Sequence, residues 1–68
     1  MANMELLRDK INSTGIPLTF IAKGCAMTRH ALYNKLAGKS EFKASEIFYL
    51  TKILHLTHAE RDQIFFGE

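Results

Sequence analysis

The stretch between Leu18 and Gly38 constrains the fold of this chain more than any other part. Its apolar residues recur at helical spacing on either side of the segment 24–26 (Gly-Cys-Ala), where a glycine favours a turn. Thr28 is a favoured N-cap residue for the helix after the turn, and Gly38 is a favoured stop for it. The stretch therefore predicts two short helices joined by a tight turn.

The size of the chain limits its stability. Its 68 residues form one domain, 1–68, near the lower limit for folding without disulfides or metal. A hydrophobic content of 47% allows a compact core. Because a core this small rarely supplies more than about 3–5 kcal/mol, association into a homodimer would help.

The cysteine content and the apolar runs indicate the cellular location. Cys25 is the only cysteine, which excludes an intrachain disulfide and fits a reducing cytoplasm. It is expected to be a small buried turn residue rather than a reactive thiol. No apolar run approaches the roughly 18 residues of a membrane span, and Glu5, Arg8 and Asp9 argue against a signal peptide. We expect a cytoplasmic protein without membrane contact.

Helical periodicity extends along the whole chain, and no stretch alternates apolar and polar residues as a strand does. Gly15 is suited to end the first helix in a left-handed conformation, and Pro17 to begin the second. Thr57 and Glu60 form a capping-box pair at the start of the last helix. The fold is therefore predicted to be all-α. The five predicted helices span about 3–12, 18–23, 28–37, 44–55 and 57–65.

Each predicted helix carries an apolar stripe that is expected to face a shared core. Phe48 is expected to broaden the stripe of the fourth helix, and Phe66 to join an apolar cluster at the C-terminus. That cluster is more apolar than a solvated tail, and it motivates the expected homodimer. The other candidate core residues are Met4, Leu6, Leu7, Ile11, Leu18, Ile21, Ala22, Met27, Ala31, Leu32, Leu36, Ile47, Leu50, Ile53, Leu54, Ile64 and Phe65.

Positive charge is concentrated in the middle of the chain. The net charge of the whole chain is +2. The segment 23–43 contains five basic residues and one acid, Glu41, so its own net charge is +4. No acid occurs between Lys23 and Ser40, although helices that only pack usually carry Glu–Lys pairs on their outer side. Since an acid would repel phosphate, the distribution favours a nucleic-acid partner. A merely solvated face is the alternative.

Three side chains of the predicted helix 28–37 suit the recognition of base edges. Arg29 and His30 lie in its first turn, the part of a recognition helix that meets the bases. Arginine can form two hydrogen bonds with guanine O6 and N7, and Asn34 can do the same with adenine N6 and N7. The three side chains point to similar sides of the helix. They are the candidate base contacts, and exposed polar residues without a ligand are the alternative.

Six further residues are candidate contacts to DNA phosphates. Thr28 caps the helix, and the N–H groups behind it suit a phosphate. Phosphate contacts from the loop 39–43 would position the protein on the DNA and make its affinity depend on salt, but they would not distinguish one base sequence from another. Tyr33 faces outward and either bonds a phosphate or packs on a neighbouring loop. The candidate phosphate contacts are Thr28, Tyr33, Lys35, Lys39, Ser40 and Lys43.

The sequence contains no catalytic or metal-binding motif. His55 and His58 straddle the break between the last two predicted helices, but a metal site needs a third and usually a fourth ligand at suitable spacing. Cys25 with His30 adds no such motif. No Ser/His/Asp grouping, paired carboxylates or phosphate-binding glycine loop is present. We expect no enzyme activity, cofactor, metal or small-molecule substrate.

The same residues resemble a known family. The stretch 18–36 resembles the helix-turn-helix of phage Cro/CI-type repressors, the XRE or lambda-repressor-like family, in its framework residues Ile21-Ala22, Ala26-Met27 and Leu32. The rest is similar to small regulators from phages and prophages of Gram-positive bacteria, in the segments 33–39 (Tyr-Asn-Lys-Leu-Ala-Gly-Lys), Glu41-Phe42, Glu46-Ile47 and Ile64-Phe65-Phe66. The resemblance covers nearly the whole chain. It implies a five-helix lambda-repressor-like DNA-binding domain in which helices two and three form the helix-turn-helix.

The resemblance also implies roles for individual residues. It implies that Ala22 is the small residue where helices two and three meet, and that Leu32 anchors the recognition helix. It places the three candidate base contacts where family members contact bases, and Thr28 where they contact phosphate. Two residues depart from the pattern. Ala26 replaces a usual glycine, which costs about 1 kcal/mol in a left-handed conformation, and Lys35 replaces an apolar residue.

From these observations we expect a sequence-specific transcriptional regulator that binds double-stranded DNA. It is expected to repress by occupying an inverted-repeat operator as a homodimer. The alternative is a helix-turn-helix fold used for protein–protein interaction, as in an antirepressor or antitoxin, which the Phe-rich C-terminus permits. The acid-free helix argues against that alternative, and strong salt dependence of DNA binding would separate the two.

Overall fold

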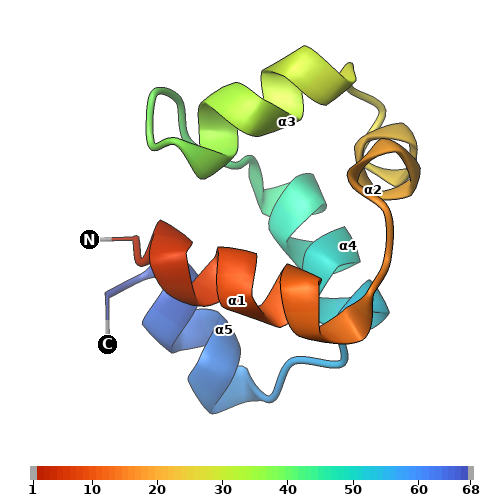
Figure 1. Ribbon diagram of the computed structural model, residues 1–68. Helices are drawn as coiled ribbons and strands as arrows, with labels where there is room; N and C mark the ends of the chain where they lie inside the picture. The colour runs from red at the N-terminus through yellow and green to blue at the C-terminus, as the bar shows by residue number, and fades with distance from the viewer. Residues whose placement is uncertain (1, 68) are drawn as a thin grey trace.

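The computed structural model describes residues 2–67 of the domain expected at 1–68, and Met1 and Glu68 lie outside the described residues. Within this range the chain forms five α-helices and no strand, so the fold is all-α (Figure 1). The helices are α1 (Met4–Thr14), α2 (Leu18–Gly24), α3 (Arg29–Leu36), α4 (Ala44–Ile53) and α5 (His58–Phe65). The predicted type and order of the elements are confirmed.

α1 continues to Thr14, two residues beyond its predicted end, because hydroxyl groups support its last turn. Ser13 Oγ donates to the carbonyl of Lys10 at 2.9 Å, and Thr14 Oγ1 donates to the carbonyl of Ile11 at 2.8 Å. Gly15 then ends the helix in the predicted left-handed conformation, with φ 73° and its N–H bonded to the carbonyl of Ile11.

α4 ends at Ile53, two residues earlier than predicted. His55 has φ 53°, and the N–H of Leu56 donates to the carbonyl of Thr51 at 3.0 Å. This is the pattern with which a left-handed residue closes a helix. Glycine usually occupies that position, so the histidine carries no stop signal in the sequence.

One fully buried aliphatic side chain from each helix forms the centre of the core. These side chains are Leu7, Ile21, Leu32, Leu50 and Ile64. Each contributes about 1.5–3 kcal/mol by its burial, so all five helices depend on one shared core. The other predicted core residues that are buried or partly buried around this centre are Met4, Leu6, Ile11, Leu18, Ala22, Met27, Leu36, Ile47, Ile53, Leu54 and Phe65.

Two predicted apolar contacts are wrong. Phe48 is 67% exposed and Phe66 is 54% exposed. Phe48 lies about 200° around α4 from Leu50, which faces the core, and Phe66 follows the last residue of α5. Phe65 is buried and packs edge-on against Phe42, with ring centroids 5.7 Å apart. The terminal apolar cluster is therefore divided between the core and the surface.

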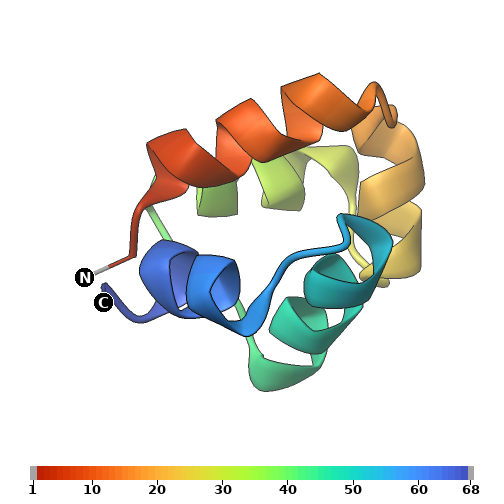
Figure 2. The same cartoon turned by 90° about the horizontal axis from the view of Figure 1, so that it is seen from below.

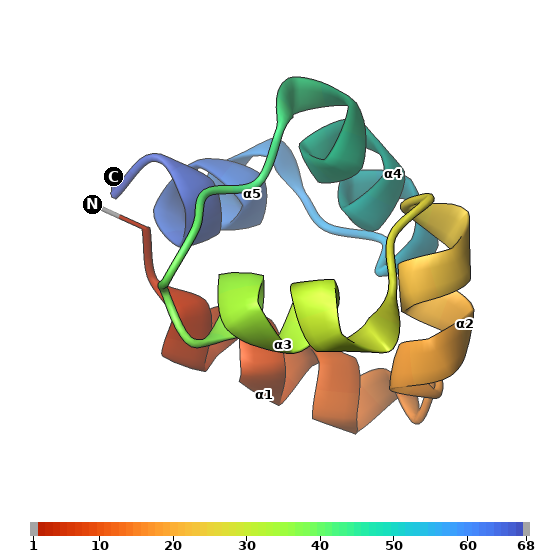
Figure 3. The ribbon, with the colours of Figure 1, turned by 90° about the horizontal axis from the view of Figure 1, so that it is seen from above.

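α3 lies along one edge of the molecule, above α1 in Figure 1. Among the helix pairs, α2 and α3 pack most closely, and α3 also contacts α1. The view from above shows α2 crossing at the N-terminal end of α3, and the loop after α3 leading to α4 (Figure 3). The predicted pair of helices thus has the arrangement of a helix-turn-helix.

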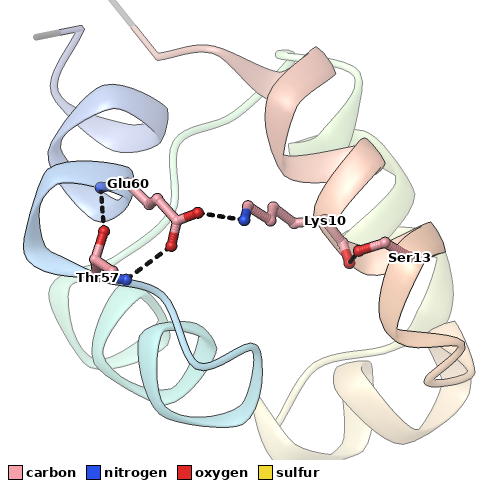
Figure 4. A network of polar contacts seen from close by, with 4 residues as sticks. All are labelled: Lys10, Ser13, Thr57 and Glu60. Atoms are coloured by element: carbon pink, nitrogen blue, oxygen red, sulfur yellow. Dashed lines mark hydrogen bonds and ion pairs between the residues drawn. The ribbon is translucent and has the colours of Figure 1, made fainter.

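The two chain ends meet on the side of the molecule formed by α1 and α5 (Figure 2). The N–H of Asn3 donates to the carbonyl of Ile64 at 2.6 Å. Farther along α1, Lys10 forms an ion pair with Glu60 (Figure 4). Glu60 also accepts the N–H of Thr57 at 2.9 Å, while its own N–H donates to Thr57 Oγ1 at 3.1 Å, which confirms the predicted capping box.

Candidate nucleic-acid interface

Backbone hydrogen bonds close the turn between α2 and α3. The N–H of Ala26 donates to the carbonyl of Lys23 at 3.0 Å, and the N–H of Met27 donates to that of Ala22 at 2.9 Å. Ala26 has φ 58°, the left-handed conformation that costs about 1 kcal/mol in a residue with a Cβ. The closed turn fixes the point at which α3 begins.

Gly24 has a packing role at the end of α2. A Cβ placed on Gly24 would lie 1.9 Å from the hydroxyl oxygen of Tyr49 in α4. A larger residue would displace the tyrosine ring, so the glycine permits a close approach of α4 to the helix-turn-helix. The left-handed conformation of the turn belongs to Ala26 instead.

α3 presents polar side chains away from the core. Its two leucines are buried, as predicted, whereas Arg29, His30 and Tyr33 are exposed and Asn34 is half-buried. Successive helical residues are about 100° apart, so His30 and Asn34 lie opposite the leucines. Arg29 and Tyr33 lie one turn apart along one flank. The predicted base contacts are therefore spread over the outer side and one flank of α3.

Arg29 and Tyr33 contact each other on that flank. Arg29 Nη2 donates to the hydroxyl oxygen of Tyr33 at 2.9 Å. The guanidinium carbon of Arg29 lies 5.3 Å from the centroid of the Tyr33 ring, within the range of a cation–π interaction. For Tyr33 the sequence left a phosphate contact and packing on a loop as alternatives, and in the structure its hydroxyl accepts a hydrogen bond from Arg29 of its own helix.

The N-terminus of α3 is capped by Thr28, as predicted. Thr28 Oγ1 accepts the N–H of Ala31 at 3.1 Å. No acidic residue occupies the first turn of α3. The partial positive charge of the helix N-terminus is therefore not neutralised by a side chain of that turn.

Lys35 does not lie on the exposed side, as a phosphate contact requires. Its Nζ lies 2.7 Å from a carboxylate oxygen of Glu46, and the two side chains are only 13% and 10% exposed. The same oxygen accepts the N–H of Lys43 at 2.8 Å. The prediction of Lys35 as a phosphate contact does not fit this geometry, because its ammonium group is covered and paired. The pair instead joins the end of α3 to the start of α4.

The ionisation of Glu46 follows from these neighbours. Burial opposes the charged carboxylate, but the hydrogen bonds from Lys35 and Lys43 and the charges of both lysines outweigh burial and lower the pKa of Glu46. The ion pair is therefore charged at neutral pH.

The loop after α3 carries the remaining predicted phosphate contacts. Gly38 has φ 82°, and the N–H of Lys39 donates to the carbonyl of Asn34 at 2.9 Å, so the chain reverses direction directly after the helix. Lys39, Ser40 and Lys43 are all exposed. The loop thus presents two lysines near the C-terminal end of α3.

The exposed charge between Lys23 and Lys43 is smaller than the count of basic residues suggests, because Lys35 is paired. The exposed acid of this segment is Glu41. The exposed basic residues are Lys23, Arg29, Lys39 and Lys43. Two of them precede or begin α3 and two follow it, so positive charge lies near both ends of the helix.

Cys25 is buried in the turn, as predicted. Burial raises the pKa of its thiol, the charge of Glu46 raises it further, and the charge of Lys35 opposes this. A thiol that resists ionisation in this way is a poor nucleophile.

Residues 2–67 carry neither a cluster of metal-ligating side chains nor a membrane-spanning helix. They contain no group of three or more His, Cys, Asp or Glu residues that could hold a metal ion. In the same range, no helix has the length and apolar character needed to cross a membrane.

We found no match to this chain among protein-family models, curated proteins or solved structures. Its function has to follow from the residues and the geometry of the site.

Three residues that shape this surface were not recognised from the sequence. Glu46 pairs with Lys35, and Gly24 admits Tyr49. Arg8 Nη1 donates to the last carbonyl of α3 at 2.6 Å. Each acts across two helices, so its signal exists only once the helices are assembled. The one local clue is the polar Lys35 beside the buried Leu36.

Proposed function

We propose that this protein is a sequence-specific double-stranded DNA-binding regulator of transcription, a Cro/CI-type repressor that inserts α3 into the major groove of its operator. The observation that carries the proposal is the outer side of α3. The helix lies at the edge of the molecule, carries His30 and the half-buried Asn34 on that side and the exposed Arg29 on the adjoining flank, and has exposed lysines beyond both ends. These are the side-chain types that bind base edges and phosphates.

In this proposal Arg29, His30 and Asn34 contact bases. Thr28, at the N-terminus of α3, contacts a phosphate together with the backbone N–H groups of the first turn. Loop residues Lys39, Ser40 and Lys43 contact the backbone at the other end of the helix. Lys35 is removed from this set because it is paired with Glu46.

We further propose that the protein binds an inverted repeat as a homodimer, without a cofactor, a small-molecule substrate or enzyme activity. In a two-fold dimer the two α3 helices would read half-sites about 34 Å apart. Phe66, rather than the buried Phe65, is the exposed aromatic residue at the C-terminus that such an interface can use.

The test is a selection from a random duplex pool at physiological salt, followed by sequencing of the retained duplexes. We expect an enriched inverted repeat for the wild-type protein. Arg29→Ala should lose about 1–3 kcal/mol of binding free energy on that site and relax the preference at one base pair. Retention without enrichment would leave a nonspecific binder and would contradict the proposal.

Lys52→Ala is the matched control for charge. Lys52 is exposed near the end of α4 and lies outside the candidate interface. The variant removes one positive charge, as Arg29→Ala does, but it should retain the wild-type base preference. A loss of preference in both variants would mean that the effect is not specific to Arg29 and would remove it as a base contact.

A second function, protein–protein interaction, is favoured by one observation. Phe20 of α2 and Phe48 of α4 are 56% and 67% exposed, and both line one surface groove with Tyr49 and Ile53. Aromatic residues are enriched in protein interfaces. If no duplex is retained in the selection at any salt concentration, this groove becomes the first candidate for the functional surface.

A further inference from the structure

We propose that Tyr33 is a positioning residue that holds the guanidinium of Arg29 in one orientation for two hydrogen bonds to a guanine. The inference rests on the proposed function, since it assigns one base preference to the same helix. In this inference Tyr33 does not contact a phosphate. It affects DNA binding by orienting Arg29.

Two contacts define the orientation of Arg29. The Nη2–hydroxyl hydrogen bond of 2.9 Å holds one edge of the guanidinium, and the guanidinium carbon lies 5.3 Å from the centroid of the Tyr33 ring. The two residues are one helical turn apart, the spacing at which side chains meet on a helix surface. An arginine held by both contacts has fewer conformations than a solvated one.

Tyr33 itself lies on the flank of α3 next to α1. Together with Arg8, Ile11, Leu18 and other residues it lines a hollow of 230 Å³ between these helices. Its ring is therefore at the margin of the packed scaffold rather than on the outermost line of α3. That location suits a residue that supports a longer neighbouring side chain.

The hydrogen bond leaves Arg29 enough donors to bind a base. A guanidinium has five N–H donors in a fixed plane. One of them is used by Tyr33, and recognition of guanine O6 and N7 requires two. Within residues 2–67 no carboxylate pairs with Arg29, so its positive charge also stays available to DNA.

Preorganisation is the physical basis of the expected effect. Ordering a flexible side chain on binding reduces affinity, and a side chain that is already ordered avoids that loss. Ordering the Arg29 side chain before binding strengthens only its hydrogen bonds to the guanine, so the gain in affinity should depend on the identity of one base pair. It does not apply to phosphate contacts, which depend mainly on charge.

The experiment is a double-mutant cycle on the duplex enriched by the wild-type protein. The guanine is first located as the base pair at which Arg29→Ala loses its preference. Dissociation constants are then measured for wild type, Tyr33→Phe, Arg29→Ala and the double variant. Each protein is tested on this duplex and on one with that base pair replaced. Tyr33→Phe removes the hydroxyl group and keeps the ring, and Tyr33→Leu removes both.

We expect Tyr33→Phe to weaken binding to the guanine duplex about 3-fold to 10-fold, and Tyr33→Leu to weaken it further. Neither change should affect binding to the replaced duplex or the dependence on salt, and Tyr33→Phe, which keeps the ring, should leave the thermal midpoint unchanged. In the Arg29→Ala background, Tyr33→Phe should cause no further loss, because its effect passes through Arg29.

Other results would overturn the inference and identify what is wrong. An equal loss on both duplexes that persists in the Arg29→Ala background would make Tyr33 a phosphate contact. Unchanged binding by Tyr33→Phe would show that Arg29 needs no support. An Arg29→Ala variant with wild-type base preference would remove Arg29 as a base contact while leaving the proposed function intact. Failure of the wild-type protein to enrich any duplex would remove the proposed function as well.

Discussion

α3 and α5 are helices of equal length that use their N-termini differently. Each has eight residues, and each follows a threonine N-cap, Thr28 or Thr57. In α5, Glu60 completes a capping box and also pairs with Lys10. In α3 the equivalent position is Ala31, and the first turn has no acid. α5 therefore balances the charge of its N-terminus within the molecule, whereas no acid of the first turn balances that of α3.

The comparison separates residues that stabilise the fold from residues that bind. Both helices supply one fully buried aliphatic side chain, so they are equivalent toward the core. They differ toward solvent, where α5 forms ion pairs and, within residues 2–67, no acid pairs with Arg29 of α3. Substitutions toward the core should therefore act alike in the two helices, and substitutions at the N-termini should not.

The largest effect is expected from core truncation. Leu32→Ala in α3 and Ile64→Ala in α5 should each lower the free energy of unfolding by about 2–5 kcal/mol. That is comparable to the whole stability of a core this small, about 3–5 kcal/mol, so both variants should be largely unfolded at 25 °C. Circular dichroism with urea titration measures this, and Phe48→Ala, at an exposed position, is the control. A folded Leu32→Ala with wild-type stability would contradict a shared core.

The next largest effect is expected from making α3 resemble α5. Ala31→Glu introduces the third-position acid of a capping box, which is compatible with folding. It also places a negative charge where a phosphate is proposed to bind, so DNA affinity should fall at least about tenfold. Fluorescence anisotropy with the selected duplex measures the affinity.

Ala31→Gln is the matched control, because glutamine can complete the same capping box without a charge. It should bind DNA nearly as well as wild type. Glu60→Gln in α5 should lower the thermal midpoint and leave DNA affinity unchanged. If Ala31→Glu binds DNA like wild type, the N-terminus of α3 does not face a phosphate.

An intermediate effect is expected at the carboxylate that joins α3 to α4. Glu46→Gln removes a largely buried, charge-assisted contact and should lower the free energy of unfolding by about 1–3 kcal/mol at pH 7. Because the folded protein lowers the pKa of Glu46 below its usual 4.5, its contribution is present above that pH and is lost as the pH falls through the lowered value.

Urea titrations between pH 7 and pH 3 test this prediction. Wild type should lose stability below about pH 4.5, where the unfolded chain begins to bind the proton, and Glu46→Gln should lose less. The pKa of Glu60 is also lowered, first by the Lys10 hydrogen bond, so that part of the acid sensitivity should remain in the variant. Identical pH profiles for the two proteins would mean that the Lys35 pair contributes nothing to stability.

The sequence predicts the local features of both helices and not the contacts between elements. Thr28, Thr57 and Gly15 act within a few residues of their own position, so their caps could be recognised directly. The apolar stripes could also be predicted from the sequence, because 3.6-residue periodicity determines which side of a helix is buried. These features account for the number, order and approximate ends of the helices.

The error at Phe48 is a misreading of helical periodicity, which already places it opposite Leu50, whereas the errors at the candidate site concern residues whose role depends on tertiary packing. Lys35 and Glu46 are 11 residues apart, and Arg8 contacts a carbonyl 28 residues away. The position of Lys35 beside the buried Leu36 hints that it is covered, but no local pattern identifies Glu46 as its partner. The candidate site shows the same division: its residue types were evident from the sequence, but the pairing of Lys35 and the contact of Arg29 with Tyr33 required the assembled fold.

The smallest effect is expected from single exposed charges. Lys39→Ala, in the loop after α3, should weaken binding to all duplexes alike and reduce the slope of log K against log salt by about one unit, the value for one phosphate contact. Arg61→Ala removes the same charge from α5, where Arg61 pairs with Asp62 at 2.9 Å, and should leave the slope unchanged. Equal reductions in both variants would show that DNA responds to the net charge of the protein. Only a reduction confined to Lys39 supports the division of roles between the two helices.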